Sequence, residues 1–330
     1  MTSRSRRALL ALTAVLAVLP TIVVGARAQE TKLAFAGSVT WYGQVPIMVA
    51  IEKGFFKEQG LEIDYKIILN SSDRIAAVTA GSVHFSNLGR LAVIAQMAQS
   101  NQSFYYFANV DDSPGNEGCV GRPGIGSIKE LKGKKVAANT SAEISLHGQL
   151  RANGMTIADV QYVNLPPNEM AGALAKGDVD AACVWKPLLD AVVKAVPEGK
   201  ILGSDLDTDT YKKYGTASAP DIMIISKKLA DEQPEVAKKL ATALLKGADY
   251  AVSNPAETAA AVAHYFKKSP EETLEGSKGF RFFGSKDWQK HMDLHEKQMQ
   301  ELADWLLENK KISSKVADVT KWRNFSFMPK

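Results

Sequence analysis

Short apolar runs alternate with amphipathic stretches along the chain once the N-terminal segment is passed. The apolar runs at 31–37 and 61–69 have the length and composition of β-strands, and a stretch with helical spacing follows each of them. Gly60 and Gly81 are placed to end two of the helical stretches, and Ser72 is placed to cap the one between them. This alternation predicts a parallel α/β sheet.

A turn-rich segment at 111–126 interrupts the alternation, which resumes over 134–196. A further strand at 221–226 leads into a tail that is almost wholly helical. Because this tail leaves no room for a third sheet, we expect its helices to pack back onto the first lobe. The pattern predicts two α/β lobes joined by more than one crossing. The expected boundaries are 29–113 for the N-terminal part of lobe 1, 114–220 for lobe 2, and 221–330 for the hinge return and the C-terminal helices that complete lobe 1.

The N-terminus has the pattern of a secretory signal peptide. Residues 1–7 are basic, 8–25 are apolar, and 26–28 form a small-x-small cleavage site. A retained membrane anchor is the alternative, but Pro20 interrupts the apolar run and the cleavage site follows directly. No cysteine follows the apolar run to carry a lipid. We therefore expect cleavage after Ala28 and a periplasmic location.

Charge and length limit the classes of partner. The full chain has 40 basic and 36 acidic residues, and the leader holds four arginines and no acid, so the mature charges balance. Nothing here favours nucleic acid or an anionic membrane surface as a partner. About three hundred residues support two cores, and we expect a monomer.

Two cysteines remain in a compartment that permits disulfides. Cys183 lies within an apolar run that reads as a buried strand, so a plain core cysteine is the favoured interpretation. A bridge between Cys119 and Cys183 is the alternative.

Motifs for phosphate, metal or nucleophile chemistry are missing from the sequence. The glycines of 118–126 lack the Lys-Ser/Thr of a phosphate loop, and we expect an inter-lobe turn there. His291 and His295 share a helix face without an evident third ligand, which favours a solvated helix over a metal site. No Gly-x-Ser-x-Gly or Ser/Cys–His arrangement is present. The sequence therefore predicts no catalytic residue, no metal and no cofactor.

Aromatic and polar residues gather where the predicted strands end or begin. Ligands of α/β sheets bind outside the carboxyl ends of the strands, so these side chains are expected to face the cleft between the lobes. Together they outline a pocket with aromatic walls and a few charges. These residues are Trp41, Tyr42, Asn87, Arg90, Trp185 and Asp221.

Six segments, taken in their order and spacing, carry a resemblance to a known family. The chain resembles the periplasmic solute-binding proteins of ATP-driven importers for taurine, alkanesulfonates and nitrate, and among them the taurine-binding proteins most. The resemblance implies a type II periplasmic-binding-protein-like clamshell of two α/β lobes with two hinge strands. It also implies closure on a small-molecule ligand and docking on an inner-membrane permease. The segments are "VAIEKGFFKEQGLEI", "AAVTAGSVHFSNLG", "LKGKKVAA", "VQYVNLPP", "ALAKGDVDAACVWKP" and "DIMIISKKLADEQPEV".

The resemblance also assigns roles to individual residues. Asp221 falls on the acid that receives the amine in taurine binders, Trp185 on the cleft tryptophan, and Asn87 on the turn asparagine of the first lobe. The other candidate ligand contacts are Gln44, Ser72, Ser141 and Glu143.

Glu143 is where the chain departs from the family, because taurine binders offer hydroxyl groups to the sulfonate at this helix start. One interpretation is a capping box with Thr140. The other is a cleft carboxylate that, with Asp221 and the aromatic residues, favours a cationic ligand. Arg90 would then bind an acidic end of the ligand or pair with Glu143 on closure. The sequence thus predicts a small nitrogen-containing solute with a cationic or polar amine.

The predicted function is the solute-binding component of an ABC importer, without enzymatic activity. Pyrimidine-precursor synthases of thiamine biosynthesis share the clamshell and supply the enzyme alternative. They resemble intracellular proteins with a cysteine-rich iron motif, and that motif is absent here. A periplasmic sensor subunit with the same pocket is a third possibility.

Overall fold

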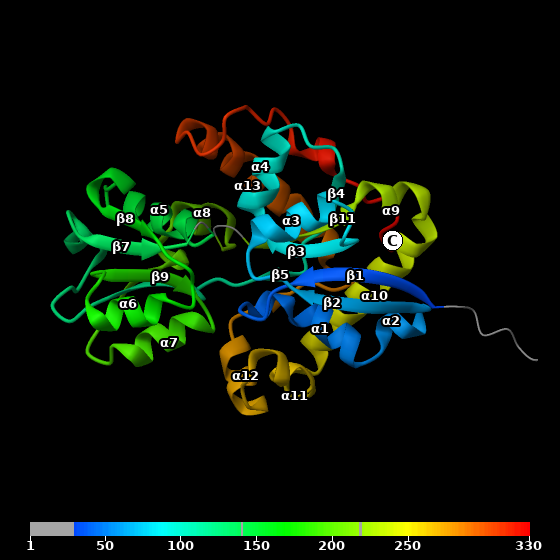
Figure 1. Cartoon of the computed structure of the whole chain (residues 1–330), viewed down its shortest axis with the longest axis horizontal. Helices are drawn as coiled ribbons and strands as arrows, with labels where there is room; N and C mark the ends of the chain where they lie inside the picture. Colours follow the sequence, from blue (N-terminus) through cyan, green and yellow to red (C-terminus); the bar gives the residue numbers. More distant parts are fainter. Residues whose placement is uncertain (1–29, 140, 218–219) are drawn as a thin grey trace, which may run out of the picture.

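The computed structural model describes residues 30–139, 141–217 and 220–330, and within these ranges it contains two five-stranded sheets and one two-stranded sheet. Each large sheet is the centre of one lobe, and the lobes lie side by side along the long axis of the molecule (Figure 1). We name them lobe 1, on the right in that view, and lobe 2, on the left. The expected mixed α/β fold is confirmed.

The sheet of lobe 1 has the strand order β2-β1-β3-β11-β4. β1 pairs in parallel with β2 and β3, whereas β11 is antiparallel to both β3 and β4. The strands are β1 (Thr31–Gly37), β2 (Leu61–Ile67), β3 (Phe85–Gly89), β4 (Phe104–Ala108) and β11 (Asp221–Ser226).

Helices from both ends of the sequence cover this sheet. The long helix α10 packs against α1, and Gly247 permits the close approach: a Cβ there would lie 2.3 Å from the Pro46 carbonyl oxygen. The C-terminal helices therefore complete the core of lobe 1. The helices are α1 (Val45–Glu52), α2 (Phe55–Glu58), α3 (Ser71–Thr79), α4 (Arg90–Ala98), α9 (Lys227–Glu232), α10 (Pro234–Ser253), α11 (Pro255–Phe266), α12 (Pro270–Ser277) and α13 (Trp288–Glu308).

Lobe 2 has the strand order β10-β6-β9-β7-β8, in which β7 pairs in parallel with β8 and β9. β6 is antiparallel to both of its neighbours. The elements are β6 (Glu117–Gly121), β7 (Lys135–Ala138), α5 (Glu143–Ala152), β8 (Gln161–Asn164), α6 (Met170–Lys176), β9 (Ala181–Trp185), α7 (Leu188–Ala195), β10 (Lys200–Ser204) and α8 (Asp209–Tyr214).

Two expectations about the connecting segments are corrected by the strands β5 (Asp111–Asp112), β6 and β12 (Arg281–Phe282). β5 pairs with β12, so the C-terminal tail does contribute a strand to a third sheet. The glycines at 118 and 121 lie in the buried strand β6 rather than in an inter-lobe turn. β6 pairs with β9 and packs in the apolar core of lobe 2, and these contacts stabilise the strand despite its glycines.

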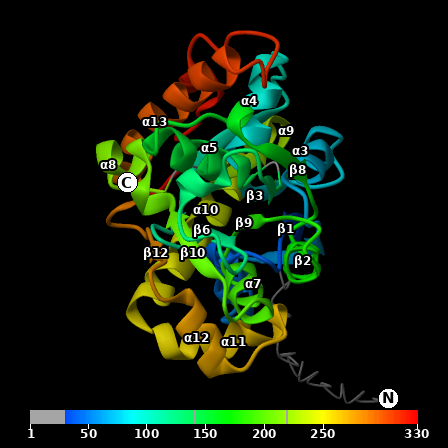
Figure 2. The same ribbon diagram turned by 90° about the vertical axis from the view of Figure 1, so that its left-hand side faces the viewer.

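Helix α13 lies along lobe 1 and reaches the edge of lobe 2, where Figure 2 shows it beside α5 and α8. His295 of this helix is fully buried, and the ring of His291 stacks on Phe283 with centroids 3.5 Å apart. The expectation of a solvated helix face is therefore wrong, because α13 packs between α4 and the edge of lobe 2. Among the described residues no group of acidic, His or Cys side chains is arranged to hold a metal.

No helix in the described ranges is long and apolar enough to cross a membrane. The expected leader at 1–28 and its cleavage site lie outside the described residues.

Cys119 and Cys183 form a disulfide that joins β6 to β9. The two residues are direct register partners in the antiparallel pair, so the preference for a plain core cysteine was wrong. The sequence could not show that these two strands, 64 residues apart, are neighbours.

Reduction of this disulfide should lower the melting temperature of the mature protein. Cross-linking residues 64 apart removes chain entropy from the unfolded state worth about 4 kcal/mol. The measurement is thermal unfolding with and without a reductant. The double variant Cys119→Ala/Cys183→Ala should melt at the lower temperature in both conditions. A wild-type melting temperature that does not change with the reductant would contradict the prediction.

Candidate functional site

The candidate site is built where β3 ends and β11 begins. The antiparallel register of these strands places Asp221 directly opposite Gly89. Gly89 is also the residue that precedes α4, with φ −61° and ψ 137°, so the strand turns into the helix without a loop. A carboxylate from the return strand is thereby fixed beside a helix start.

Three polar atoms from both lobes surround Gly89. A Cβ built on Gly89 would lie 3.5 Å from Ser71 Oγ, 3.6 Å from Ser141 Oγ and 3.7 Å from Asp221 Oδ1. Ser71 and Asp221 belong to lobe 1, whereas Ser141 precedes α5 in lobe 2. The structure therefore brings Ser141 and Asp221 of the predicted set to one point between the lobes.

Ser71, rather than the predicted Ser72, is the serine of α3 at this point. Ser72 is exposed, and the residue that precedes α3 is Asn70, so the expected capping role of Ser72 is wrong. Ser71 Oγ instead accepts hydrogen bonds from the Gly89 N–H at 3.2 Å and from Arg74 Nη2 at 3.0 Å. An offset of one residue moves a helical side chain by about 100° around the axis, which separates the two serines.

Arg74 is a site residue that the sequence analysis missed. Its guanidinium is buried, and it also donates to the carbonyl oxygens of Ile68 and Leu69 at 2.8 and 2.9 Å. Within the described ranges it has no carboxylate within salt-bridge distance. The available signal was its position three residues after Ser71, one turn along the same helix.

Asp221 holds an unusual carboxylate. Burial raises its pKa to about 6, against the opposing effects of Arg74, Arg90 and a hydrogen bond from Gln44. Gln44 Nε2 donates to Asp221 Oδ2 at 3.2 Å, which leaves Oδ1 on the side of Gly89. A positively charged group beside Oδ1 would favour the ionised form.

Gln44 and Asn87 lie beneath this carboxylate, and both are fully buried. Gln44 Nε2 also approaches the Asn87 carbonyl oxygen at 3.3 Å, and Asn87 Nδ2 donates to the Gly43 carbonyl oxygen at 3.4 Å. These contacts position the start of α1 against β3 and orient Asp221.

The predicted aromatic residues separate into two groups. Trp185 of lobe 2 donates its Nε1–H to the Thr40 carbonyl oxygen of lobe 1 at 2.8 Å, and its ring meets Trp41 edge-on at 6.3 Å. Tyr42 instead is fully buried in lobe 1, with its ring 4.5 Å from Phe266. Trp41 and Trp185 thus form a contact between the lobes, and Tyr42 belongs to a core cluster.

Arg90 is fully buried in lobe 1 and points toward α13. It donates to Gln298 Oε1 at 2.6 Å and to the His295 carbonyl oxygen at 3.3 Å, and it also bonds Asn109. The structure therefore does not show the expected pairing of Arg90 with Glu143, because the guanidinium is hydrogen-bonded to residues of α13.

Glu143 bonds across the lobes to a different cation. Its carboxylate accepts from Lys311 Nζ at 2.5 Å and lies 3.3 Å from His147 Nε2. Burial raises its pKa, but the hydrogen bonds with His147 and Lys311 outweigh burial and hold the pKa below its ordinary value. Lys311 follows α13 in lobe 1, so this ion pair is a second contact between the lobes.

The capping-box interpretation of Glu143 involves Thr140, which lies outside the described residues. Next to it, the Asn139 side chain accepts a hydrogen bond from the Ala142 N–H at 2.9 Å. Asn139 therefore supplies an acceptor at the start of α5.

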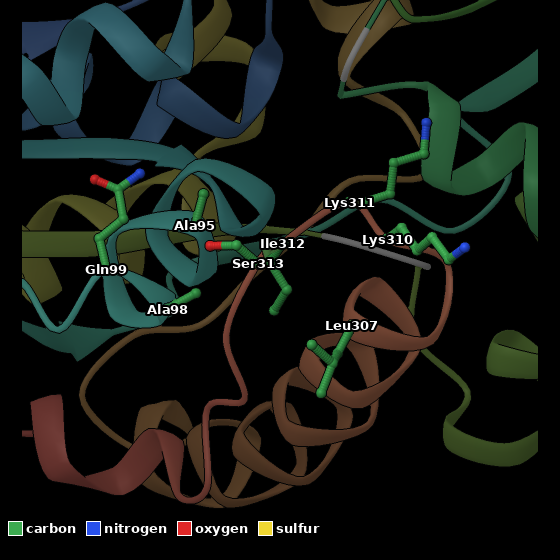
Figure 3. A pocket seen from close by; sticks show the side chains of 8 residues that line it. All are labelled: Ala95, Ala98, Gln99, Leu307, Lys310, Lys311, Ile312 and Ser313. Atoms are coloured by element: carbon green, nitrogen blue, oxygen red, sulfur yellow. The ribbon is translucent and has the colours of Figure 1, made fainter.

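A hollow of about 560 Å³ lies between α4 and the end of α13, away from this site (Figure 3). Its walls come from lobe 1 alone, and none of the polar groups around Gly89 line it. Lys311 extends from this region toward lobe 2, where it meets Glu143. The lining residues are Ala95, Ala98, Gln99, Leu307, Lys310, Lys311, Ile312 and Ser313.

Residues 42–258 match the NMT1/THI5-like family, which is well over half of the chain. The chain belongs to the NMT1/THI5-like family. This match includes β3, β11 and α5, the elements that form the candidate site.

Sequence relatives of this family member include binding proteins and enzymes. The taurine-binding periplasmic protein of Escherichia coli is 29% identical over 73% of this chain and 72% of its own length. A Brucella abortus protein that bears the name "putative binding protein" is 26% identical over 79% of each chain. The 4-amino-5-hydroxymethyl-2-methylpyrimidine phosphate synthase of Candida albicans is 24% identical over 74% of this chain and 77% of its own length.

Solved structures share the fold at lower identity. The alkanesulfonate-binding protein SsuA of Xanthomonas axonopodis, bound to MOPS, has a TM-score of 0.73 at 16% identity over 90% of this chain and 99% of its own. The periplasmic aliphatic sulphonate-binding protein SsuA of Escherichia coli has a TM-score of 0.71 at 17% identity, with 88% and 91% coverage. The desulfurization enzyme DSZB has a TM-score of 0.65 at 17% identity, with 90% and 97% coverage. The chain therefore has the fold of periplasmic solute-binding proteins.

Gly89→Ala should weaken ligand binding without disturbing the fold. The backbone of Gly89 is compatible with alanine, and the added methyl would make ordinary contacts at 3.5–3.7 Å while it occupies the space between the three polar atoms. We expect a loss of about tenfold or more in affinity, roughly 1.4 kcal/mol. Calorimetric titration of both proteins measures it. Gly172→Ala, whose added Cβ meets nothing within 4 Å, is the matched control, and unchanged affinity of Gly89→Ala would place the ligand elsewhere.

Glu143→Gln should destabilise the protein in a pH-dependent way. The folded-state pKa of Glu143 is below its ordinary value of 4.5, so its stabilising effect is present above that pH and is lost as the pH falls through the folded-state pKa. The gap in melting temperature between wild type and variant should be largest near pH 7 and should shrink below about pH 4.5. Glu308→Gln, at an exposed position, is the control. A gap that is independent of pH would contradict the role of the ion pair.

Proposed function

We propose that this chain is the exported solute-binding component of an ABC importer, and that it captures a small solute with a cationic amine in the cleft around Gly89. The family membership, the shared fold and the presence of a taurine-binding relative support the importer role. The expected signal peptide supports the periplasmic location.

The surroundings of the Asp221 carboxylate are the main support for the amine assignment. One carboxylate oxygen is held by Gln44, and the other faces the point shared with Ser71 and Ser141. A mostly buried carboxylate is costly when it is ionised without a partner, and an ammonium group supplies both the charge and the hydrogen bonds. The amine of the solute would therefore bind at Asp221 Oδ1.

The position of the site between the lobes supports capture by closure. Ser141 comes from lobe 2 and the other polar groups from lobe 1, so the site is complete only when the lobes approach each other. The Glu143–Lys311 and Trp185–Thr40 contacts join the lobes in this arrangement. A solute that contacts both lobes stabilises the closed form, which a permease can then recognise.

An enzyme on the same fold is the second candidate, because the relatives include a pyrimidine phosphate synthase and the desulfurization enzyme DSZB. The two candidates differ in turnover. An enzyme converts a bound compound into product repeatedly, whereas a binding component releases the solute unchanged.

Asp221→Asn tests the amine assignment. Matched pairs such as taurine and isethionate, or β-alanine and 3-hydroxypropionate, differ only in an amine and a hydroxyl group. In a thermal-shift screen the wild type should prefer the amine of each pair, since a bound ligand stabilises by mass action, and the variant should lose the preference. The wild-type affinity for the amine should also fall below about pH 6, where Asp221 becomes protonated. A wild type without preference for amines would overturn the proposal.

The same variant makes a prediction for the unliganded protein. The pKa of Asp221 is raised from 3.8 to about 6 in the folded state, so its contribution to stability is lost as the pH rises through about 6. Asp221→Asn should therefore have a higher free energy of unfolding than the wild type at pH 8, by on the order of 1–3 kcal/mol, and the difference should close toward pH 4. A variant that is less stable at pH 8 would show that the carboxylate has a structural role.

A further inference from the structure

In the described part of the chain, two segments cross between the lobes, and a buried carboxylate joins them. The first crossing, residues 109–116, links β4 to β6, and the second begins at Gly215 after α8 and leads to β11. Asp112 of the first crossing is fully buried, and its Oδ1 accepts a hydrogen bond from the Ala217 N–H of the second at 2.8 Å. Its Oδ2 lies 3.2 Å from Arg281 Nη2 of β12. One side chain therefore holds the two crossings together.

Gln298 of α13 binds the second crossing to lobe 1. Its side chain is buried, and its Nε2 donates to Thr216 Oγ1 at 3.0 Å and to the Ala217 carbonyl oxygen at 2.6 Å. Its Oε1 accepts from Arg90 at 2.6 Å, and Arg90 also bonds Asn109 of the first crossing. Buried hydrogen bonds are strengthened by the low local dielectric. The amide and the guanidinium thus fix both crossings against α4 and α13.

The lobe 2 ends of the crossings are held by other partners. Asp205, which precedes α8, is fully buried and accepts a hydrogen bond from the Gly115 N–H at 2.9 Å. The Gly215 N–H donates to the Tyr211 carbonyl oxygen of α8 at 2.7 Å, whereas the Gly215 carbonyl oxygen accepts from Arg281 Nη2 at 2.8 Å. In the second crossing, the change from lobe 2 partners to lobe 1 partners therefore falls on Gly215 itself.

Both points of change contain a glycine in the left-handed conformation. Gly115 has φ +81° and lies in a turn that the Asn116 N–H closes on the Ser113 carbonyl oxygen at 3.0 Å, and Gly215 has φ +66°. Glycine enters and leaves this conformation at little cost, whereas other residues are strained in it. A Cβ at Gly215 would meet no described atom within 4 Å, so packing does not require a glycine there. The backbone conformation does.

We infer that Gln298 and Asp112 are positioning residues for closure, because they make both crossings part of lobe 1. Lobe 2 then rotates about the two points at which the partners change, Gly115 and Gly215. This inference goes beyond the proposed function and takes from it only the movement of the lobes, since the identity of the solute does not enter it. Arg90 follows Gly89 directly, so the hydrogen bonds that hold the crossings begin at the helix start that forms the candidate site.

The distance between the lobes tests the rotation at Gly215 and can be measured without a solute. Nitroxide labels at Lys194→Cys in lobe 2 and Lys228→Cys in lobe 1, both exposed, report it by pulsed electron paramagnetic resonance, because the native cysteines are in the disulfide. Gly215→Ala disfavours the present φ, so the ratio of lobe arrangements should change by about fivefold or more. Gly154→Ala is the matched control, with φ +73° after α5 and an equally open Cβ position. It should lower the melting temperature but keep the wild-type distances.

Gln298→Glu tests the hold on the second crossing. The carboxylate keeps the size of the side chain and pairs with Arg90, but it cannot donate to Thr216 or Ala217. The distances between the lobes should therefore spread over a wider range than in the wild type. Gln300→Ala, on the same helix, removes hydrogen bonds within lobe 1 only. It should melt at a lower temperature with the wild-type distances.

The outcomes separate this inference from the proposed function. Wild-type distances in either Gly215→Ala or Gln298→Glu would overturn the inference, and so would an equal change of distance in the control variants. Neither outcome alters the preference for amines, which is measured with Asp221→Asn. Conversely, a wild type without that preference would overturn the proposed solute and leave the rotation points standing.

Discussion

The insertion of β11 between β3 and β4 is the constraint on which the site depends. This strand arrives from lobe 2, runs antiparallel to both neighbours and places Asp221 opposite Gly89. The carboxylate is thereby fixed beside the start of α4 and within reach of Ser71, and no flexible loop intervenes.

The charges of the molecule are divided between holding the fold, joining the lobes and forming the site. The Arg90 guanidinium donates hydrogen bonds to Gln298 and Asn109 inside lobe 1. Glu143 is neutralised by Lys311 from the other lobe. Asp221 is different, because its Oδ1, the oxygen nearest Gly89, has no cationic partner within salt-bridge distance in the described ranges. A cation is therefore more favourable at Asp221, because Glu143 already pairs with Lys311.

Much of the fold could be predicted from the sequence, because strand and helix periods are local properties. The alternation predicted both lobes, and the strand ends pointed to Asp221. What failed depended on distant neighbours. Arg74 rather than Arg90 lies at the site because Arg90 is bonded to α13. The partner of Glu143 is 168 residues away along the chain. The disulfide depends on which strands are adjacent in the sheet. Ser72 was expected to cap α3, but the helix starts two residues earlier, with Asn70 before it, which changes the face that each serine occupies.

A crystal structure of the mature protein, purified with the solute that it carries from the cell, tests the central claim most directly. The account predicts density between the lobes at Gly89, with a nitrogen of the solute at Asp221 Oδ1. Density for a solute in the hollow between α4 and α13, or one that approaches Asp221 only through apolar atoms, would contradict it.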